Sequence, residues 1–250
     1  MRYAFAVLTT AASLLLSACG NDDRERKFVA RDVGALYNLG KDYLERGRYS
    51  DAAIFFDEVE RQHPYSQWAR RAQLLSAYSY YRANKYDDAV LSAERFLTLH
   101  PGNADTDYAY YLIAICHYER IIDIARDQKM TQRALQALNE VTRRFPDSEY
   151  AEDASLKIDM ARDHLAGKEM EIGRFYQRQG QHLAAIGRFK SVVDNYDTTS
   201  HAPEALHRMT ESFLSLGITT EAQKAAATLG FNYPGSKWYR YSYELIQGKS

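Results

Sequence analysis

The side chains best suited to catalysis or metal binding are two cysteines, Cys19 and Cys116, and seven histidines. A catalytic thiolate needs an imidazole within hydrogen-bond reach, but Cys116 and His117 are sequence neighbours that point in different directions on a helix. His201 and His207 have a poor helical spacing for sharing a metal ion. The sequence contains no glycine-rich phosphate loop, no His-Glu-x-x-His and no Gly-x-Ser-x-Gly motif. We therefore expect no enzyme, no cofactor and no metal site, and Cys116 as a buried small apolar residue.

Cys19 suits lipid modification rather than catalysis, because it directly follows a typical export signal. An apolar run over residues 3–16 is shorter than the roughly 20 residues that a membrane-spanning helix needs. Leu16-Ser17-Ala18-Cys19 resembles the bacterial lipobox, in which the cysteine thiol is acylated and the chain is cut just before it. We predict a signal peptide over residues 1–18 and a lipidated, flexible tether over residues 19–27. The alternative is an ordinary signal peptide in which Cys19 is incidental.

The residue after Cys19 bears on where such a chain would be anchored. By resemblance to sorted lipoproteins, an Asp at this position favours retention in the inner membrane, and here the residue is Gly20. Several acyl chains hold a protein stably at a bilayer, whereas one chain holds it only marginally. We therefore expect a lipid anchor in the inner leaflet of the outer membrane, with the folded part facing the periplasm.

The overall composition is that of a folded, nearly neutral protein. The chain has 250 residues, of which 46% are hydrophobic, and 32 Lys and Arg oppose 33 Asp and Glu. A net charge of -1 argues against a nucleic-acid partner, because such proteins carry a basic excess. The 20 tyrosines against 10 phenylalanines and 2 tryptophans are unusual, so most of the aromatic surface carries a hydroxyl group.

Prolines mark an internal repeat in the part of the chain beyond Lys27. Apolar residues recur there at helical spacing, and Pro64, Pro101, Pro146 and Pro234 each follow an apolar helical stretch. Counting back 12 residues from Pro64, Pro101 and Pro234, and from Asp197 in the equivalent place, gives Ala52, Ala89, Ala222 and Ala185. Counting back 21 residues from the same positions gives Tyr43, Tyr80, Phe213 and Tyr176. Such a frame predicts repeated pairs of helices, each pair ended by proline or its substitute.

This frame resembles the tetratricopeptide repeat, most clearly in Leu39-Gly40-x-x-Tyr43 with Ala52-x-x-x-Phe56. Small residues let the two helices of a hairpin cross closely, and the large aromatic fills the space beside them. We predict an all-α fold, an α-solenoid of five tetratricopeptide-type helical hairpins over residues 28–250, treated as one continuous unit. The third hairpin is lengthened by residues 121–130, and its first helix is predicted from Asp107 to about Ile121.

The first helix of each repeat lines the inner groove of such a solenoid. Positions one and four after the small-residue mark, and three before it, should face inward, which makes the groove rich in tyrosine. The predicted peptide-groove residues are Tyr37, Tyr78, Tyr81, Tyr108, Tyr111 and Tyr118. Phenol rings supply rigid contact area with one hydrogen-bonding tip, which suits an extended polypeptide. The alternative is that several of these rings pack between neighbouring repeats.

The two ends of the solenoid differ in charge. Residues 19–167 have a net charge of -4, whereas residues 168–250 have a net charge of +2. This small bias favours an acidic partner for the C-terminal repeats. Arg174, Arg178 and Arg188 are the candidate contacts.

Five longer segments, taken with the lipobox and the tether, are similar to those of one protein family. The segments are His63-Pro64-Tyr65-Ser66, Ala77-Tyr78-Ser79-Tyr80-Tyr81, Asp123-x-x-Arg126-Asp127-Gln128, Phe145-Pro146-Asp147-Ser148-Glu149-Tyr150-Ala151 and Tyr233-Pro234-Gly235-Ser236. The chain resembles the BamD (ComL) family of outer-membrane assembly lipoproteins. The resemblance covers nearly the whole chain.

The resemblance implies a non-enzymatic subunit of the BAM complex, which inserts β-barrel proteins into the outer membrane. The N-terminal repeats, about 28–146, would bind unfolded outer-membrane protein substrates in the groove. The C-terminal repeats, about 147–250, would dock a periplasmic POTRA domain of BamA, with Arg188 pairing with a BamA carboxylate. Other BAM lipoproteins are further candidate partners. The alternative is a periplasmic tetratricopeptide adaptor that coordinates cell-wall synthesis or division.

Overall fold

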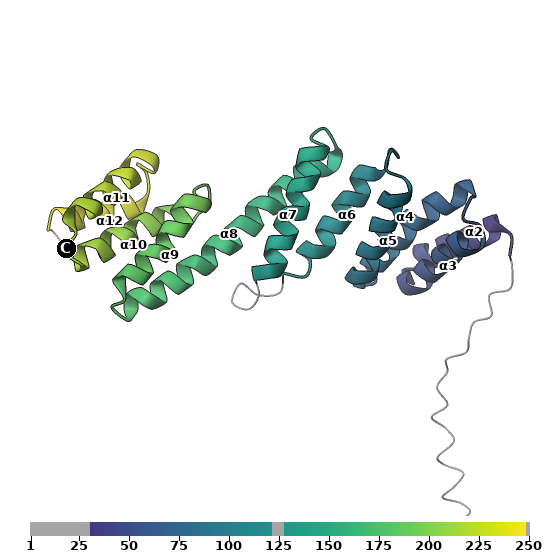
Figure 1. Ribbon diagram of the computed structural model, residues 1–250, viewed down its shortest axis with the longest axis horizontal. Helices are drawn as coiled ribbons and strands as arrows, with labels where there is room; N and C mark the ends of the chain where they lie inside the picture. The colour runs from purple at the N-terminus through teal and green to yellow at the C-terminus, as the bar shows by residue number, and fades with distance from the viewer. Residues whose placement is uncertain (1–30, 122–127, 249–250) are drawn as a thin grey trace, which may run out of the picture.

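The computed structural model describes residues 31–121 and 128–248, so the predicted signal peptide, tether and Cys19 lie outside the described residues. Within those ranges the chain forms helices and no strand (Figure 1). The helices are α2 (Val33–Glu45), α3 (Tyr49–Gln62), α4 (Gln67–Arg82), α5 (Tyr86–Leu99), α6 (Thr106–Tyr118), α7 (Gln128–Arg144), α8 (Glu149–Arg178), α9 (His182–Asn195), α10 (Ala202–Ser215), α11 (Thr219–Asn232) and α12 (Lys237–Ile246). None of the described helices is both long enough and apolar enough to cross a bilayer.

The helices stack as hairpins in an elongated array, which confirms the predicted all-α solenoid (Figure 1). The pairs α2/α3, α4/α5, α6/α7, α8/α9 and α10/α11 are the five hairpins, and α12 packs on the last of them. Among the described helices, each first helix contacts the first helix of the next hairpin, and no second helix contacts another second helix. The first helices therefore share one face of the array, which we call the inner face.

Local sequence explains where the hairpins begin and turn. Ser66, Ser148 and Ser236 cap the N-termini of α4, α8 and α12, each accepting a hydrogen bond from a backbone N–H of the first turn. Three of the turns between paired helices place glycine in the left-handed region, with a φ of 70° at Gly47, for example. The second hairpin uses Asn84 at the same position, with a φ of 58°.

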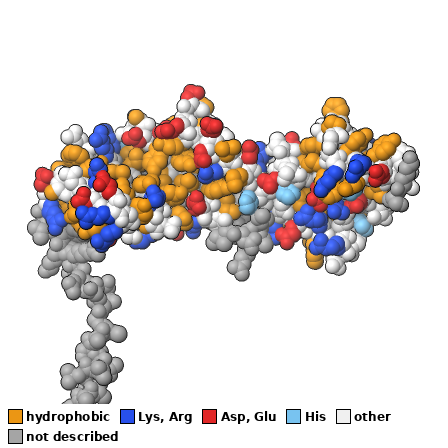
Figure 2. Space-filling view, turned by 180° about the vertical axis from the view of Figure 1, so that it is seen from behind, with side chains coloured by type: hydrophobic (Ala, Val, Ile, Leu, Met, Phe, Trp, Pro, Cys, Tyr) orange, Lys and Arg blue, Asp and Glu red, His pale blue; other side chains and the backbone are white. Residues whose placement is uncertain are grey.

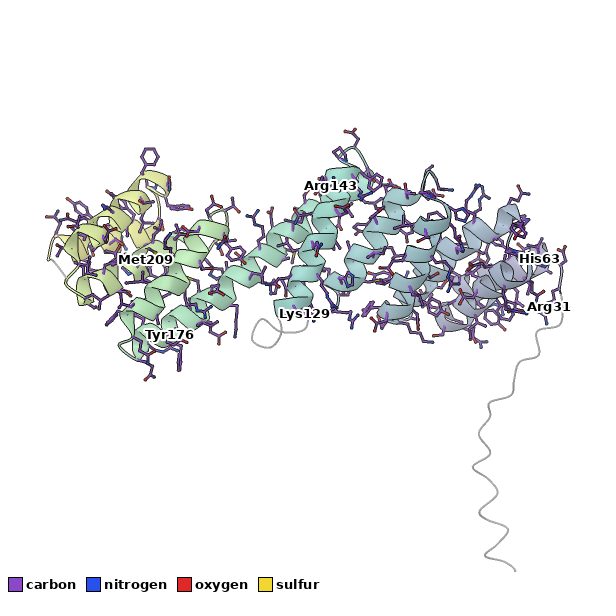
Figure 3. The ribbon with its side chains drawn as sticks, in the orientation of Figure 1. Arg31, His63, Lys129, Arg143, Tyr176 and Met209 are labelled. Carbon is purple, nitrogen blue, oxygen red and sulfur yellow. The ribbon has the colours of Figure 1, made fainter. Side chains whose placement is uncertain are left out.

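The close crossing within a hairpin depends on a residue without a side chain facing a phenylalanine. A Cβ atom on Gly40 would lie 2.8 Å from the Phe56 ring, and Gly173 faces the Phe189 ring in the same way. Both phenylalanine side chains are fully buried. In the C-terminal half, Tyr176 and Met209 pack against the cluster that contains Phe189 (Figure 3). The small-residue positions in the repeat frame therefore allow the helices to approach.

The helix α8 departs from the regular repeat. It has 30 residues, which corresponds to a length of about 45 Å. Its N-terminal part packs on α6 and α7, and its C-terminal part pairs with α9 and contacts α10 (Figure 1). The predicted division between residues 146 and 147 falls in the loop before α8. α8 contacts helices of both predicted parts, so the helix contacts do not separate them. The division stays a prediction.

The third hairpin differs in detail from the prediction. Its first helix, α6, ends at Tyr118 rather than near Ile121, because the backbone turns after Glu119 and the Ile121 N–H donates to the Tyr118 carbonyl. The lengthened connection predicted at residues 121–130 falls mostly on residues 122–127, outside the described ranges.

Candidate functional site

Part of the predicted tyrosine groove forms a cavity on the inner face of the N-terminal half. The cavity has a volume of about 400 Å³ and is lined by Tyr37, Arg71, Leu74, Leu75, Tyr78, Asp105 and Tyr108. These residues come from α2, α4, α6 and the loop before α6. Figure 2 shows hydrophobic side chains gathered over the N-terminal part of one face of the molecule. The structure thus brings together three of the six predicted tyrosines.

The three tyrosines of this cavity are held in different ways. Tyr37 is only 9% exposed, and its ring centroid lies 4.7 Å from that of Trp68. The hydroxyl of Tyr78 accepts a hydrogen bond from Nη1 of Arg82 at 2.6 Å. Burial, reinforced by the neighbouring phenols, raises the pKa of Tyr108 above its usual range. Ring packing therefore holds Tyr37, a hydrogen bond holds Tyr78, and burial keeps the Tyr108 phenol neutral.

The other three predicted tyrosines do not line this cavity. The Tyr111 hydroxyl donates to Oδ2 of Asp153, and its ring stacks on Tyr150 with centroids 5.0 Å apart. The hydroxyl oxygen of Tyr118 lies 3.5 Å from the sulfur atom of Met160. Because Asp153, Tyr150 and Met160 belong to α8, these two rings pack between the third and fourth hairpins.

Tyr81 lies on α4 and is half-buried, with its ring centroid 6.2 Å from that of Tyr86 on α5. Burial, with the Glu119 carboxylate nearby, raises the pKa of Tyr81. Its ring therefore contacts the second helix of its own hairpin. A role for Tyr81 in peptide binding stays a prediction, as it does for the other five tyrosines.

Sequence reasoning missed the two charged residues at the rim of the cavity. Arg71 and Asp105 are both exposed and bring opposite charges to the edge of a largely apolar pocket. Arg71 lies three residues before Leu74, so applying the inward spacing one helical turn earlier would have found it. Asp105 lies in a loop, where helical spacing gives no signal.

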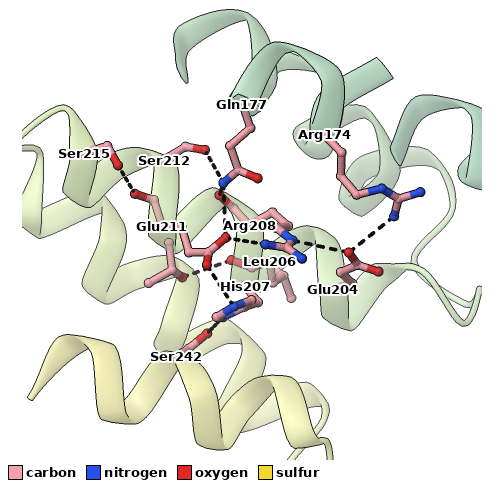
Figure 4. A network of polar contacts seen from close by, with 11 residues as sticks. Arg174, Gln177, Glu204, Leu206, His207, Arg208, Glu211, Ser212, Ser215 and Ser242 are labelled. Carbon is pink, nitrogen blue, oxygen red and sulfur yellow. Dashed lines mark hydrogen bonds and ion pairs between the residues drawn. The ribbon is translucent and has the colours of Figure 1, made fainter. Parts of the chain in front are cut away.

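On the inner face of the C-terminal half, polar contacts bridge neighbouring helices (Figure 4). The Glu204 carboxylate accepts from Arg174 of α8 and from Arg208 of α10, at 3.3 Å in each case. The Glu211 carboxylate accepts from Gln177 at 3.1 Å and from Arg208 at 3.0 Å. These contacts tie α8 to α10 along the face that is hollow in the N-terminal half.

The same network continues to α12 through a buried histidine. Nδ1 of His207 lies 2.8 Å from the Ser242 hydroxyl, and Nε2 lies 3.4 Å from the Glu211 carboxylate (Figure 4). Burial opposes the charge on Glu211, but the hydrogen bond from His207 and the positive charges of His207 and Arg208 outweigh it. Together they lower the pKa of Glu211 to about 2.

The three candidate arginines of the C-terminal repeats lie in different settings. Nη1 of Arg188 on α9 lies 3.2 Å from Oε2 of Glu169 on α8, and its side chain is 45% exposed. Arg174 belongs to the polar network, and Arg178 is exposed at the end of α8. Arg188 is therefore held within the chain through one nitrogen, and its side chain stays partly exposed.

Cys116 and its sequence neighbour His117 on α6 are wholly and partly shielded from solvent, respectively. Cys116 is fully buried, and burial raises the pKa of its thiol to about 12. Burial, helped by the positive charges of Arg120 and Arg133, lowers the pKa of His117. Within residues 31–121 and 128–248, no group of three or more His, Cys, Asp or Glu side chains could hold a metal ion.

Stacked helical hairpins with a tyrosine-lined cavity on the inner face define a tetratricopeptide-type solenoid. Residues 30–229 match the model of the YfiO family, described as outer membrane lipoprotein, and the chain belongs to that family.

The chain is also similar to curated proteins named outer membrane protein assembly factor BamD. It is 49% identical to that of Caulobacter vibrioides, over 96% of this chain and 80% of the relative. It is 44% identical to that of Rickettsia prowazekii, over 94% of this chain and 93% of the relative. The relative from Neisseria meningitidis serogroup A is 31% identical over 95% of this chain and 94% of its own length.

Solved structures of tetratricopeptide-repeat proteins are more distant. A thermophilic TPR protein of Thermus thermophilus matches with a TM-score of 0.39 and 17% identity, over 86% of this chain and 99% of that one. The TPR domain of P58(IPK) matches with a TM-score of 0.44 and 15% identity, over 87% of this chain and 56% of that one.

Proposed function

We propose that this chain is a non-enzymatic, lipid-anchored subunit of the BAM complex, which assembles β-barrel proteins into the outer membrane. The observation that carries the proposal is the 49% identity to an outer membrane protein assembly factor over 96% of the chain. The comparisons give no support to the alternative of a periplasmic adaptor for cell-wall synthesis or division. A scaffold needs binding surfaces rather than reactive groups, and the buried Cys116 is consistent with that.

The cavity around Tyr37, Tyr78 and Tyr108 is the proposed site for unfolded β-barrel substrates. Its apolar walls would take a large side chain, and its phenol hydroxyls and rim charges would hydrogen-bond to the main chain. A photoreactive amino acid at Tyr78 should crosslink to an unfolded β-barrel protein, and one at Tyr81 or Tyr118 should do so less. Crosslinking at none of the three would reject the groove.

The anchor belongs to the proposal because Leu16-Ser17-Ala18-Cys19 resembles the lipobox. The first described residue, Arg31, lies at the outer end of the first hairpin, where its carbonyl oxygen is 2.9 Å from Nε2 of His63 (Figure 3). Acyl chains on Cys19 would then hold the N-terminal end of the solenoid near the inner leaflet of the outer membrane. Mass spectrometry of membrane-purified protein should find Cys19 as an acylated first residue, and an unmodified Cys19 would contradict this.

The C-terminal repeats are the proposed docking end for a POTRA domain of BamA, and Arg188 is the proposed contact. The exposed part of its guanidinium could make a charge-assisted bond to a BamA carboxylate. The full chain should bind the periplasmic part of BamA in a pull-down. No binding by a chain that is folded by circular dichroism would reject the docking proposal. Other BAM lipoproteins are further proposed partners, and we assign no contact residue to them.

Reversing the charge of Arg188 tests this contact. Arg188→Glu should weaken BamA binding about tenfold or more, because it replaces an attraction by a repulsion. Arg188→Lys should weaken it less, since it keeps the charge but loses the planar fork. The matched control is Arg143→Glu on α7, whose side chain is 67% exposed and also pairs within the chain. Equal affinities for Arg188→Glu and the parent chain would remove Arg188 from the interface.

A further inference from the structure

The middle of α8 carries an uncovered apolar face. α8 runs from α7 toward α9 (Figure 1), and one side of its middle contacts the loop between α9 and α10 through Asp163 and Ser200. Leu156 is 60% exposed and Met160 is 53% exposed, although both are large apolar side chains. They lie four residues apart and therefore on one face of the helix, next to Tyr118, whose hydroxyl contacts the Met160 sulfur. Exposed apolar residues grouped in this way are typical of interaction sites.

A cavity adjoins this face where α8 meets the loop between α9 and α10. It has a volume of about 430 Å³ and is lined by Asp159, Met160, Asp163, His164, Thr198, Thr199 and Ser200. Nδ1 of His164 is buried and has no hydrogen-bond partner among the described residues. That atom is shielded from solvent, so the groups that the cavity offers to a partner are mainly the carboxylates of Asp159 and Asp163.

The charges at this cavity are mainly negative. Asp163 accepts hydrogen bonds from the backbone N–H and the hydroxyl of Ser200, at 3.3 and 2.9 Å. Oδ2 of the same carboxylate lies 3.6 Å from Nε2 of His201. Asp159 is exposed, and no hydrogen bond or ion pair joins it to another residue in the described ranges. One carboxylate therefore supports the loop, while the other is available to a partner.

We propose that the middle of α8 docks a segment of a partner protein that carries an arginine or lysine beside a large apolar side chain. The cation would pair with Asp159, and the apolar side chain would cover Leu156 and Met160 at the mouth of the cavity. Charge complementarity selects this partner, because an acidic segment would be repelled by Asp159 and Asp163. The site lies outside the Tyr37–Tyr78–Tyr108 cavity and away from Arg188, so it does not depend on either proposed contact.

Labelled peptides can test this site on the full chain purified in detergent. The probe is a fluorescein-labelled peptide of arginine and leucine in an amphipathic pattern, compared with the same peptide carrying glutamate in place of arginine. We expect the arginine peptide to bind and the glutamate peptide not to bind, as measured by fluorescence anisotropy. The double variant Leu156→Ser/Met160→Ser should weaken binding of the arginine peptide about tenfold. Asp159→Asn should weaken it about two- to fivefold, since an exposed ion pair contributes little.

Matched variants keep the result specific to α8. Leu183→Ser on α9 removes an apolar side chain that is 71% exposed, and Asp147→Asn removes an exposed carboxylate before α8. Neither should change the affinity, and Tyr78→Ala in the tyrosine cavity should also leave it unchanged. The proposal is overturned if the arginine peptide does not bind, if the glutamate peptide binds equally, or if only Tyr78→Ala weakens binding. Circular dichroism melting curves check that each variant is folded.

Discussion

The two halves of the solenoid share a scaffold but differ on their inner faces. In both, a glycine of the first helix lies against a buried phenylalanine of the second, Gly40 against Phe56 and Gly173 against Phe189. On the inner face, α2, α4 and α6 surround a tyrosine-lined cavity of about 400 Å³. The corresponding face of α8, α10 and α12 is bridged by Glu204, Glu211 and their partners.

This difference shows how one repeat can present two kinds of surface. The buried positions must recur, because each hairpin packs on the next with the same geometry. The inner positions differ between the halves, with tyrosines in the N-terminal half and ion-paired residues in the C-terminal half. Phenol rings there leave a cavity that a flexible polypeptide could enter, whereas ion pairs there hold the helices together and present a preformed surface.

The largest expected effect tests the shared scaffold. Phe56→Ala and Phe189→Ala should each lower the free energy of unfolding by about 3–5 kcal/mol, because both rings are fully buried. Urea denaturation followed by circular dichroism measures this. Phe231→Ala is the control, since that side chain is 88% exposed, and it should have little effect. A large loss for only one of the two buried rings would break the equivalence of the halves.

The next effect belongs to the polar network of the C-terminal half. Glu211→Gln should lower the free energy of unfolding by about 1–3 kcal/mol at pH 7, because it weakens charged hydrogen bonds to His207 and Arg208. The ionised carboxylate stabilises the folded state above pH 4.5, and this contribution is lost as the pH falls toward about 2. The variant should therefore lose that acid dependence.

Fluorescence of Trp238 can report this change locally. Its ring centroid lies 5.2 Å from that of His207, and Trp68→Phe leaves Trp238 as the only tryptophan in the chain. Glu244→Gln on α12 is the control, since Glu244 is exposed. An acid dependence that persists in Glu211→Gln would place its origin elsewhere.

A smaller effect is expected for binding in the tyrosine cavity. Tyr78→Ala should weaken binding of an unfolded β-barrel polypeptide about tenfold, because it removes one wall of the cavity. Tyr78→Phe keeps the ring and should recover most of the affinity. The control is Tyr243→Ala, whose side chain is 53% exposed on α12. Equal losses for Tyr78→Ala and Tyr243→Ala would erase the difference between the halves.

The smallest effect concerns Asp57 in the N-terminal half, whose pKa is shifted in the opposite direction to that of Glu211. Burial raises the pKa of Asp57 despite hydrogen bonds from Ser76 and Tyr80. Stability from its protonated form is present below its ordinary pKa of 3.8 and is lost as the pH rises through the raised value. Asp57→Asn should change the free energy of unfolding by less than about 1 kcal/mol at pH 7 and flatten this dependence.

Tryptophan fluorescence can measure the opposite pH dependences expected from Asp57 and Glu211 separately in the two halves. Trp68 packs on Tyr37 in the N-terminal half, and Trp238→Phe makes it the only tryptophan. As the pH falls below 4.5, the Trp238 signal should report destabilisation, and the Trp68 signal should not follow it in parallel. Parallel changes would mean that the halves unfold as one unit.

Much of the fold could be predicted from spacing alone. The alanines 12 residues before Pro64 and Pro101, Ala52 and Ala89, are fully buried in the second helices of their hairpins. Such positions are readable because every hairpin repeats them. The end of α6 at Tyr118 was less readable, since no proline or glycine marks it and the chain turns only through local backbone hydrogen bonds.

The candidate site was predicted only in part, because its contacts join distant residues. Helical spacing identified the inward face of α6 but could not show that the Tyr111 hydroxyl pairs with Asp153, 42 residues away. The ion pair of Arg188 with Glu169 joins the two helices of a hairpin and depends on their crossing geometry. Such pairs follow from how the hairpins stack, which the repeat frame does not specify.

The length of α8 also sets how the hairpins at its two ends are rotated relative to each other. A rigid helix advances about 1.5 Å and turns about 100° with every residue. One residue inserted near its middle would therefore swing the C-terminal hairpins by more than a quarter turn relative to the tyrosine cavity. Loops between hairpins can change length with little consequence, but insertions here would redirect one binding surface away from the other.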